Sequence, residues 1–265
     1  MSHGTVLVTG ASAGIGRALT EQFAANGWDP ILVARREERL ETACEELEAE
    51  FGVSADYVVQ DLAADGACDD LYETVTGEMD REVDVLVNNV GVGTQGEYVD
   101  IEAERDLQQL QLNVVVPSHL AKLFGRDMKA RGDGYVLNVA STAAFQPGPY
   151  MAVYYASKAY LLSFSEALYE ELKPHGVTVT ALCPGPVETE FQERAGNTDV
   201  PIGGGEGGSG LVSWQRADDV AEVGYEGLMD GKAVVIPGLD FKLLSKLTGV
   251  LPRSVSRRLA AQLNH

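Results

Sequence analysis

The feature that most constrains this chain is a regular alternation of short apolar runs with longer segments of helical spacing. The apolar runs lie at residues 5–9, 29–34, 54–62, 83–89, 134–141, 177–185 and 233–238. The first helical segment follows the first apolar run and ends near Asn26. Three others span 36–51, 101–129 and 151–173, and a further acidic helix lies between 62 and 83. Strands that are apolar throughout and are joined by helices are typical of a parallel sheet covered on both faces. The sequence therefore predicts an α/β fold, a doubly wound parallel sheet of about seven strands with helices on both faces.

No repeat or linker divides the chain, so we expect one domain over residues 1–265. Two segments depart from the alternation. The glycine-rich stretch 196–212 belongs to no periodic element, and its place after PGPVET (184–189) favours a mobile lid beside a site over a plain surface insertion. Residues 239–265 are basic and amphipathic. We expect them to pack on the acidic body or on a neighbouring subunit, with a membrane surface or lipid substrate as the alternative.

The charge is strongly acidic, with 40 acidic and 20 basic residues and a net charge of −20. An acidic surface disfavours nucleic acids and anionic membranes as partners. It also resembles proteins of a high-salt cytoplasm, in which screening relieves self-repulsion, and the alternative is an ordinary acidic protein. We expect the stability to rise well into molar KCl.

The chain shows neither a long apolar run nor a secretion signal, so we expect a cytoplasmic protein with no membrane span. Three scattered cysteines (Cys44, Cys68 and Cys183) form no disulfide framework and fit a reducing compartment. The histidines and cysteines have no ligand spacing, so no metal site is expected.

A glycine-rich turn, TGASAGIG at 9–16, follows the first predicted strand and opens the first predicted helix. Gly10, Gly14 and Gly16 permit a tight turn and a close approach to a pyrophosphate, whose charge suits a helix N-terminus. The spacing G-x-x-x-G-x-G differs from the common G-x-G-x-x-G fingerprint, so this turn alone is a moderate indication of dinucleotide binding.

Two tyrosines precede a lysine in VYYASKAY (153–160). On a helix, Lys158 lies one turn after Tyr154 on the same face, whereas Tyr155 points about 100° away. Such pairs are common on helices, where the tyrosine packs and the lysine is a solvated charge. If the pair is a chemical device, it is formed by Tyr154 and Lys158.

In its order of motifs, the sequence resembles the short-chain dehydrogenase/reductase family, in its compact single-domain branch. The motifs are TGASAGIG (9–16), Asp61-Leu62, NNVG (88–91), Asn113, Ser141, YYASK (154–158) and PGPVET (184–189). They span nearly the whole chain, and the ordered set is far more specific than any one motif. Val90 departs from the alanine that is usual in the family. The resemblance implies a Rossmann-like enzyme in which Tyr154 and Lys158 are catalytic, while Tyr155 packs or lines the substrate wall.

The resemblance also implies a chemistry for four residues. A carbonyl that takes hydride from a nicotinamide becomes an alkoxide, which needs a proton. Tyr154 would donate it, with the Lys158 ammonium lowering the tyrosine pKa from about 10 toward the operating pH. Lys158 would also hold the nicotinamide ribose. Ser141, at the carboxyl end of its strand, would bond the substrate oxygen, and Asn113 would anchor a water that relays protons to Lys158.

The end of the second strand decides which cofactor is expected. NAD enzymes place an acid there to bond the ribose 2′-hydroxyl, but here Ala34 is followed by Arg35 and Arg36. Guanidinium groups suit a 2′-phosphate, so we expect NADPH to be preferred over NADH, with Arg35 as the main contact and Ser12 as a helper. The alternative is that both arginines are surface charges. The other cofactor contacts that the resemblance implies are Gly10, Gly14, Ile15, Gly16, Arg36, Asp61, Leu62, Asn89, Gly91, Tyr154, Lys158, Pro184, Gly185, Val187 and Thr189.

The sequence therefore predicts an NADP(H)-dependent oxidoreductase that interconverts a carbonyl and a secondary alcohol. The segment from Ala156 to Phe191 looks like a branch that includes 3-oxoacyl and hydroxysteroid-type reductases, which favours a hydrophobic or acyl-type carbonyl. The alternatives are a sugar or polyol dehydrogenase and a non-catalytic dinucleotide sensor. Family members are often dimers or tetramers paired through the helices at 101–129 and 151–173, so a homodimer or homotetramer is expected.

Overall fold

The computed structural model describes residues 3–191, 214–243, 254, 257–258 and 260–261. The predicted lid at 196–212 lies outside these residues, as does most of the basic segment 239–265. Within the described part of that segment, Phe241 is buried and contacts the backbone position of Gly185.

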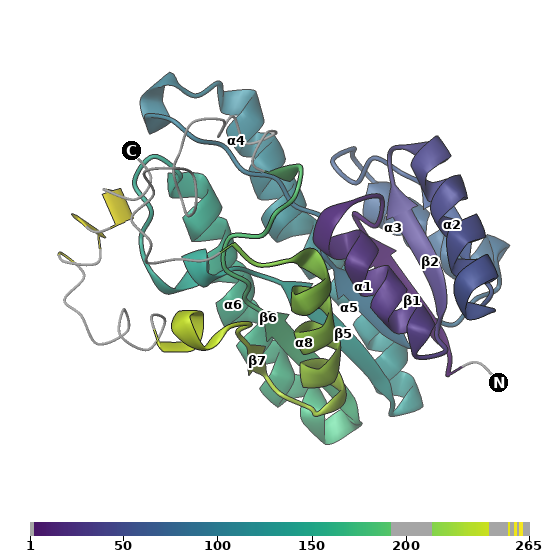
Figure 1. The fold of residues 1–265 in the computed structure, drawn as a ribbon. Helices are drawn as coiled ribbons and strands as arrows, with labels where there is room; N and C mark the ends of the chain where they lie inside the picture. Colours follow the sequence, from purple (N-terminus) through teal and green to yellow (C-terminus); the bar gives the residue numbers. More distant parts are fainter. Residues whose placement is uncertain (1–2, 192–213, 244–253, 255–256, 259, 262–265) are drawn as a thin grey trace.

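A seven-stranded parallel sheet forms the centre of the molecule, in the strand order β3-β2-β1-β4-β5-β6-β7 (Figure 1). Its strands are β1 (Thr5–Thr9), β2 (Asp29–Ala34), β3 (Asp56–Val59), β4 (Val85–Asn88), β5 (Gly134–Val139), β6 (Val177–Leu182) and β7 (Val234–Val235). This confirms the predicted fold class and places a strand within each of the seven predicted runs. The predicted runs for β3 to β7 are longer than the strands and extend into the neighbouring loops.

Alternate residues of the strands point to opposite faces of the sheet, and each face has its own core. Val6 and Val8 of β1 pack with helices α1 (Gly14–Ala25), α2 (Glu37–Phe51) and α8 (Ala217–Met229). Leu7, between them, packs with the other cluster, to which α3 (Ala67–Glu73), α5 (Val116–Arg131) and α6 (Ala152–Leu172) contribute. Figure 1 shows α1 and α8 side by side on one face. Covered on both faces, the strands can be apolar throughout.

The strand order reverses beside β1, which pairs with β2 on one side and with β4 on the other. The loops that leave the carboxyl ends of β1 and β4 therefore diverge to opposite faces. In open α/β sheets a crevice forms at this point, and it is the usual place for a ligand.

The predicted helix at 101–129 is not continuous. It consists of α4 (Ala103–Leu110), a π-helical turn η3 (Gln111–Val115) and α5, and a short 3₁₀ turn η2 (Tyr98–Asp100) precedes it. Pro117 has no N–H for the carbonyl of Asn113, four residues earlier, so the α-helical ladder must break there. Helix α8 has no counterpart in the sequence prediction. The remaining short elements are η1 (Thr74–Glu78), η4 (Thr142–Phe145) and η5 (Lys173–His175).

Candidate active site

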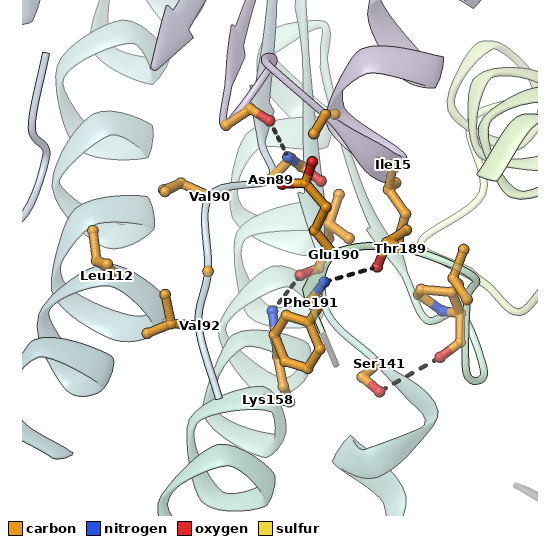
Figure 2. Close-up of a pocket in the computed structure, with 18 of the residues that line it drawn as sticks. Ile15, Asn89, Val90, Val92, Leu112, Ser141, Lys158, Thr189, Glu190 and Phe191 are labelled. Carbon is orange, nitrogen blue, oxygen red and sulfur yellow. Dashed lines mark hydrogen bonds between the residues drawn. The ribbon is translucent and has the colours of Figure 1, made fainter. Parts of the chain in front are cut away.

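A cleft of about 360 Å³ lies along the carboxyl ends of the strands, where the strand order reverses. Every residue predicted for the site lines this cleft except Asn113. Figure 2 shows the cleft between the glycine-rich turn that leads into α1 and helix α6, with Ile15 and Asn89 at one end and Lys158 and Ser141 at the other. The structure therefore brings together residues that are as far apart in the chain as Gly10 and Thr189.

The glycine-rich turn is closed tightly at the start of α1. A Cβ atom added at Gly16 would lie 2.3 Å from the carbonyl oxygen of Gly10 and 2.4 Å from the Asn89 amide nitrogen. Gly10 and Gly14 have φ values of 68° and 57°, which side chains rarely adopt. The N-cap residue, Ala13, has no side-chain oxygen to bond the first N–H groups of the helix. Within the described part of the chain, no side chain thus caps the first N–H groups of α1, which lie at the positive end of the helix and face the cleft.

Thr9 and Asn89 fix this turn to the end of β4. The Thr9 hydroxyl donates to the carbonyl of Val87 and accepts from the backbone N–H groups of Asn89 and Val90. The Asn89 amide donates to the carbonyls of Thr9 and Gly10, at 2.9 and 3.3 Å. These bonds make the two loops one rigid wall of the cleft (Figure 2).

Asn113 lies behind the cleft and connects three of its elements. Its side chain accepts from the N–H of Val92 at 3.0 Å and donates to the carbonyl of Val92 at 2.9 Å. It also donates to the hydroxyl of Ser157 at 3.1 Å, and that hydroxyl bonds the carbonyl of Tyr154. A Cβ at Gly91 would lie 3.1 Å from the Asn113 oxygen and 3.5 Å from the Lys158 nitrogen. Gly91 therefore lies against both Asn113 and Lys158, and a side chain there would crowd the Asn113 oxygen.

Ser141 and Tyr154 meet at the deep end of the cleft. The Ser141 hydroxyl accepts from the N–H of Ala143 at 3.1 Å and lies 3.4 Å from the carbonyl of Pro184. Burial raises the pKa of Tyr154 to about 12, and a side-chain hydrogen bond with Ser141 opposes this rise. The tyrosine is therefore a neutral phenol at neutral pH.

Lys158 is buried beside this pair, with only 5% of its surface exposed. Its nitrogen donates to the carbonyl of Val139 at 2.8 Å and lies 5.8 Å from the centre of the Tyr154 ring. Burial lowers the pKa of Lys158 to about 8. The pKa of Tyr154 is thus raised and not lowered as predicted, because burial outweighs the other influences on it and the Lys158 amine donates to the carbonyl of Val139.

The two arginines after β2 occupy different environments. Arg36 donates to the Ser12 hydroxyl at 2.9 Å. Arg35 is more exposed, and its Nη1 lies 3.8 Å from a carboxylate oxygen of Asp61. Both side chains line the cleft. The structure thus brings Arg36, and not the expected main contact Arg35, to Ser12.

The segment after β6 closes the cleft from the opposite side. Gly185 donates its N–H to the side-chain oxygen of Gln215 at 3.0 Å. Val187 is buried and forms an isolated parallel β-bridge with the backbone of Gln215. Thr189 then lies against the glycine-rich turn, 2.9 Å from a Cβ placed at Gly14. These contacts hold the segment against the start of α1.

Sequence reasoning missed several lining residues. Glu190 and Phe191 follow directly on the PGPVET motif, and the Phe191 ring lies 5.4 Å from the ring of Tyr154. The other missed lining residues are mostly apolar and include Val92, Leu112, Ala143, Gln146 and Met151. They follow motif residues or come from other elements, so only the fold assembles them.

Comparisons with known proteins agree with this geometry. The family model for short chain dehydrogenases matches residues 4–199. A short chain dehydrogenase of Pseudocercospora fijiensis is 37% identical over 71% of this chain and 60% of its own length. A very-long-chain 3-oxoacyl-CoA reductase of Anas platyrhynchos is 31% identical over 71% of this chain and 61% of its own length. This chain belongs to the short-chain dehydrogenase family.

A solved structure shares the fold over almost its full length. The short-chain dehydrogenase of Sphingobium yanoikuyae, in complex with NADPH, has a TM-score of 0.81 and 29% identity, and the match covers 95% of this chain and 97% of that one. The match thus spans nearly all of that dehydrogenase, but only about 60% of the two sequence relatives. Among the described residues, no helix is both long and apolar enough to cross a membrane.

Proposed function

We propose that the protein is an NADP(H)-dependent oxidoreductase that interconverts a carbonyl and a secondary alcohol, with Tyr154 as the general acid and base. The observation that carries this proposal is the meeting of Ser141, Tyr154 and Lys158 in one cleft with the glycine-rich turn. A phenol, a hydroxyl and an amine at one end, and free backbone donors at the other, fit a dinucleotide with its reactive ring beside a proton donor.

The glycine-rich turn supports the cofactor part of the proposal. Without side chains at Gly14 and Gly16, backbone N–H groups at the start of α1 would reach a pyrophosphate. Thr189 would bond the carboxamide, and Asp61 and Leu62 would flank the adenine. Lys158 would hold the ribose hydroxyls. A bound nicotinamide would supply the hydride for reduction or receive it in oxidation.

The residues of the chain would handle the proton. Since burial keeps Tyr154 protonated, its phenol is in the form that donates to an alkoxide during reduction. Ser141 would donate to the same oxygen and stabilise its developing charge. Lys158, with its pKa lowered to about 8, would be charged below that pH and would stabilise the tyrosinate left after transfer. Asn113, held by Val92 and Ser157, would anchor the water that returns a proton to Lys158.

The arginines support a preference for NADPH. Arg36 and the Ser12 hydroxyl lie together at the end of β2, and Arg35 lines the same part of the cleft. Ala34 supplies no carboxylate for a ribose 2′-hydroxyl, whereas the guanidinium groups suit a 2′-phosphate. The Sphingobium relative was solved with NADPH.

The apolar part of the cleft wall supports a hydrophobic or acyl-type carbonyl as the substrate. Val92, Leu112, Met151 and Phe191 contribute apolar surface to the cleft, and the ring of Phe191 lies 5.4 Å from that of Tyr154. A sugar or polyol would leave hydroxyl groups against this wall without partners, so the polyol alternative is less favoured. The name of the Anas relative specifies a 3-oxoacyl thioester, which is a carbonyl of this hydrophobic type.

The test is the initial rate of NADPH and NADH oxidation with 3-oxoacyl thioesters, steroid ketones, aromatic ketones and sugars. Tyr154→Phe should lose at least about 10²-fold in turnover while keeping its NADPH affinity. Tyr155→Phe is the matched control and should retain turnover, because its hydroxyl is not the proposed donor. NADPH binding without turnover on any carbonyl class would favour the dinucleotide sensor instead.

Exposed apolar side chains on α4, η3 and α6 support a homodimer or homotetramer. Leu107 and Leu110 of α4, Val115 of η3 and Tyr160 of α6 are all exposed. Exposed apolar side chains on neighbouring helices mark a surface for self-association. Leu107→Lys with Leu110→Lys should lower the mass measured by light scattering after gel filtration, whereas an unchanged mass would argue for another interface.

The domain and location expectations also stay proposals. One continuous sheet joins the first strand to the last, which supports a single domain over residues 1–265. Cys44, Cys68 and Cys183 are free and buried, which suits a cytoplasmic protein.

A further inference from the structure

Glu190 bridges two arginines at the edge of the candidate cofactor cleft. One carboxylate oxygen lies 3.1 Å from Nη1 of Arg36, and the other lies 2.7 Å from Nη1 of Arg39. Arg36 is the N-cap residue of α2, and Arg39 lies in the first turn of that helix. The bridge therefore ties the segment after β6 to the start of α2, across the cleft.

The bridge uses the guanidinium that a cofactor phosphate would need. Arg36 presents Nη1 to Glu190 and Nη2 to the Ser12 hydroxyl, so both of its terminal nitrogens are already in use. Hydrogen bonds from Arg39 and Arg36 lower the pKa of Glu190 to about 2, so the carboxylate is charged at neutral pH. Arg36 and Glu190 both line the cleft.

We infer that Glu190 sets the cofactor affinity of this protein by competing with the 2′-phosphate of NADP(H) for Arg36. The inference rests on the proposed function, since it requires that a dinucleotide binds in this cleft with its adenosine ribose near Ser12. Glu190 is then a specificity-determining residue that weakens NADP(H) and leaves NAD(H) nearly unaffected, because only the phosphorylated ribose needs Arg36.

The local charges support competition rather than assistance. Within the described part of the chain, Arg35, Arg36 and Arg39 form ion pairs with Asp61 and Glu190, and these five side chains together carry one positive charge. A 2′-phosphate carries a charge of about −1.5 to −2 at neutral pH. With Glu190 present, the single positive charge of these side chains is smaller than the negative charge of the phosphate. Without Glu190 they would carry two positive charges, which match the charge of the phosphate.

The alternative role for Glu190 is purely structural. The next residue, Phe191, lies on the ring of Tyr154, so the bridge could simply hold this turn against the cleft. A structural role would affect both dinucleotides alike, because both share the nicotinamide end. Competition would affect only the ligand that carries the 2′-phosphate.

The test measures dissociation constants of NADPH, NADH, 2′,5′-ADP and 5′-AMP by fluorescence or calorimetric titration. The variants are Glu190→Gln and the matched control Glu188→Gln. Glu188 is exposed, lies two residues earlier, and acts electrostatically on Arg216. Both changes remove one negative charge from the same segment, so the control accounts for long-range effects of net charge.

Glu190→Gln should bind NADPH and 2′,5′-ADP at least about fivefold more tightly than the unchanged protein, with less than about twofold change for NADH and 5′-AMP. The gain should shrink in molar KCl, since screening weakens the repulsion that it removes. Glu188→Gln should change all four constants by less than about twofold.

Equal changes for NADPH and NADH, or weaker NADPH binding by Glu190→Gln, would overturn the inference and assign Glu190 a structural role. In that case the proposed function would stand, because NADPH would still bind. If neither dinucleotide binds the unchanged protein, the proposed function fails, and the inference fails with it.

Discussion

The Lys158 amine donates a hydrogen bond to the carbonyl of Val139 at 2.8 Å, which fastens helix α6 to the end of strand β5. A charged group in this buried position is expensive to desolvate, and burial lowers its pKa to about 8 from an ordinary value of 10.5. The buried position of Lys158, which the proposed chemistry needs, thus lowers the stability of the fold.

We predict that Lys158→Met stabilises the protein at pH 7 and abolishes turnover. The lowering of the Lys158 pKa from 10.5 to about 8 corresponds to a cost on the order of 3 kcal/mol, part of which is offset by the bond to Val139. The expected net gain is therefore on the order of 1–2 kcal/mol in the free energy of unfolding, measured by urea denaturation.

The pH dependence gives the internal control for this prediction. The folded state holds the lysine proton less tightly than the unfolded state, so the unfolded state binds more protons between about pH 8 and 10.5. The unchanged protein should therefore gain stability relative to Lys158→Met as pH rises through this window. A constant difference between the two proteins would show that Lys158 carries no buried charge.

The same pKa predicts the pH profile of carbonyl reduction. Tyr154, with a pKa near 12, stays protonated, and Lys158 loses its charge above about pH 8. The ratio kcat/KM should be level below pH 8 and should fall as pH rises above it. Lys158→Arg keeps its charge to pH 12 and above, so its remaining activity should show no such fall. A level profile to pH 10 in the unchanged protein would contradict a role for the ammonium.

Gly16→Ala tests the glycine-rich turn. The new Cβ would meet the Gly10 carbonyl and the Asn89 amide at 2.3 and 2.4 Å, and these backbone and loop atoms have little room to move. We expect at least about tenfold weaker NADPH binding and a loss of roughly 1–3 kcal/mol in stability. Gly125→Ala is the control, since it is also a helical glycine and its Cβ would meet Leu172 at an ordinary 3.9 Å. Equal losses in both variants would mean that the effect does not come from the turn.

The sheet and most of the site could be predicted because both depend on local patterns. Apolar runs placed every strand, and ordered motifs placed Ser141, Tyr154 and Lys158 in one cleft. The predicted single helix at 101–129 missed the π-helical turn at Gln111–Val115, although Pro117 signals it, since a proline four residues after Asn113 cannot donate to the carbonyl of that residue in a regular helical ladder.

Other features required the fold itself. Glu190 reaches Arg36 and Arg39 across more than 150 residues of chain, and no local pattern signals such a contact. The pKa of Tyr154 depends on how deeply the phenol is buried, which helical spacing to Lys158 does not reveal. The pairing of Tyr154 with the Lys158 charge predicted a lowered tyrosine pKa, but burial of the phenol raises it instead.

The acidic surface leads to a prediction about salt. Helix α2 alone exposes Glu37, Glu38, Glu41, Glu45, Glu46, Glu48 and Glu50. With a net charge of −20, carboxylates repel one another more strongly in the compact folded state than in the expanded unfolded chain. Molar KCl shortens the screening length to about 3 Å at 1 M, so the melting temperature should rise from low salt to molar KCl. Sucrose at matched osmolality is the control, because it favours compact states without screening. A melting temperature that stays flat or falls with KCl, or one that sucrose raises equally, would exclude an adaptation to high salt.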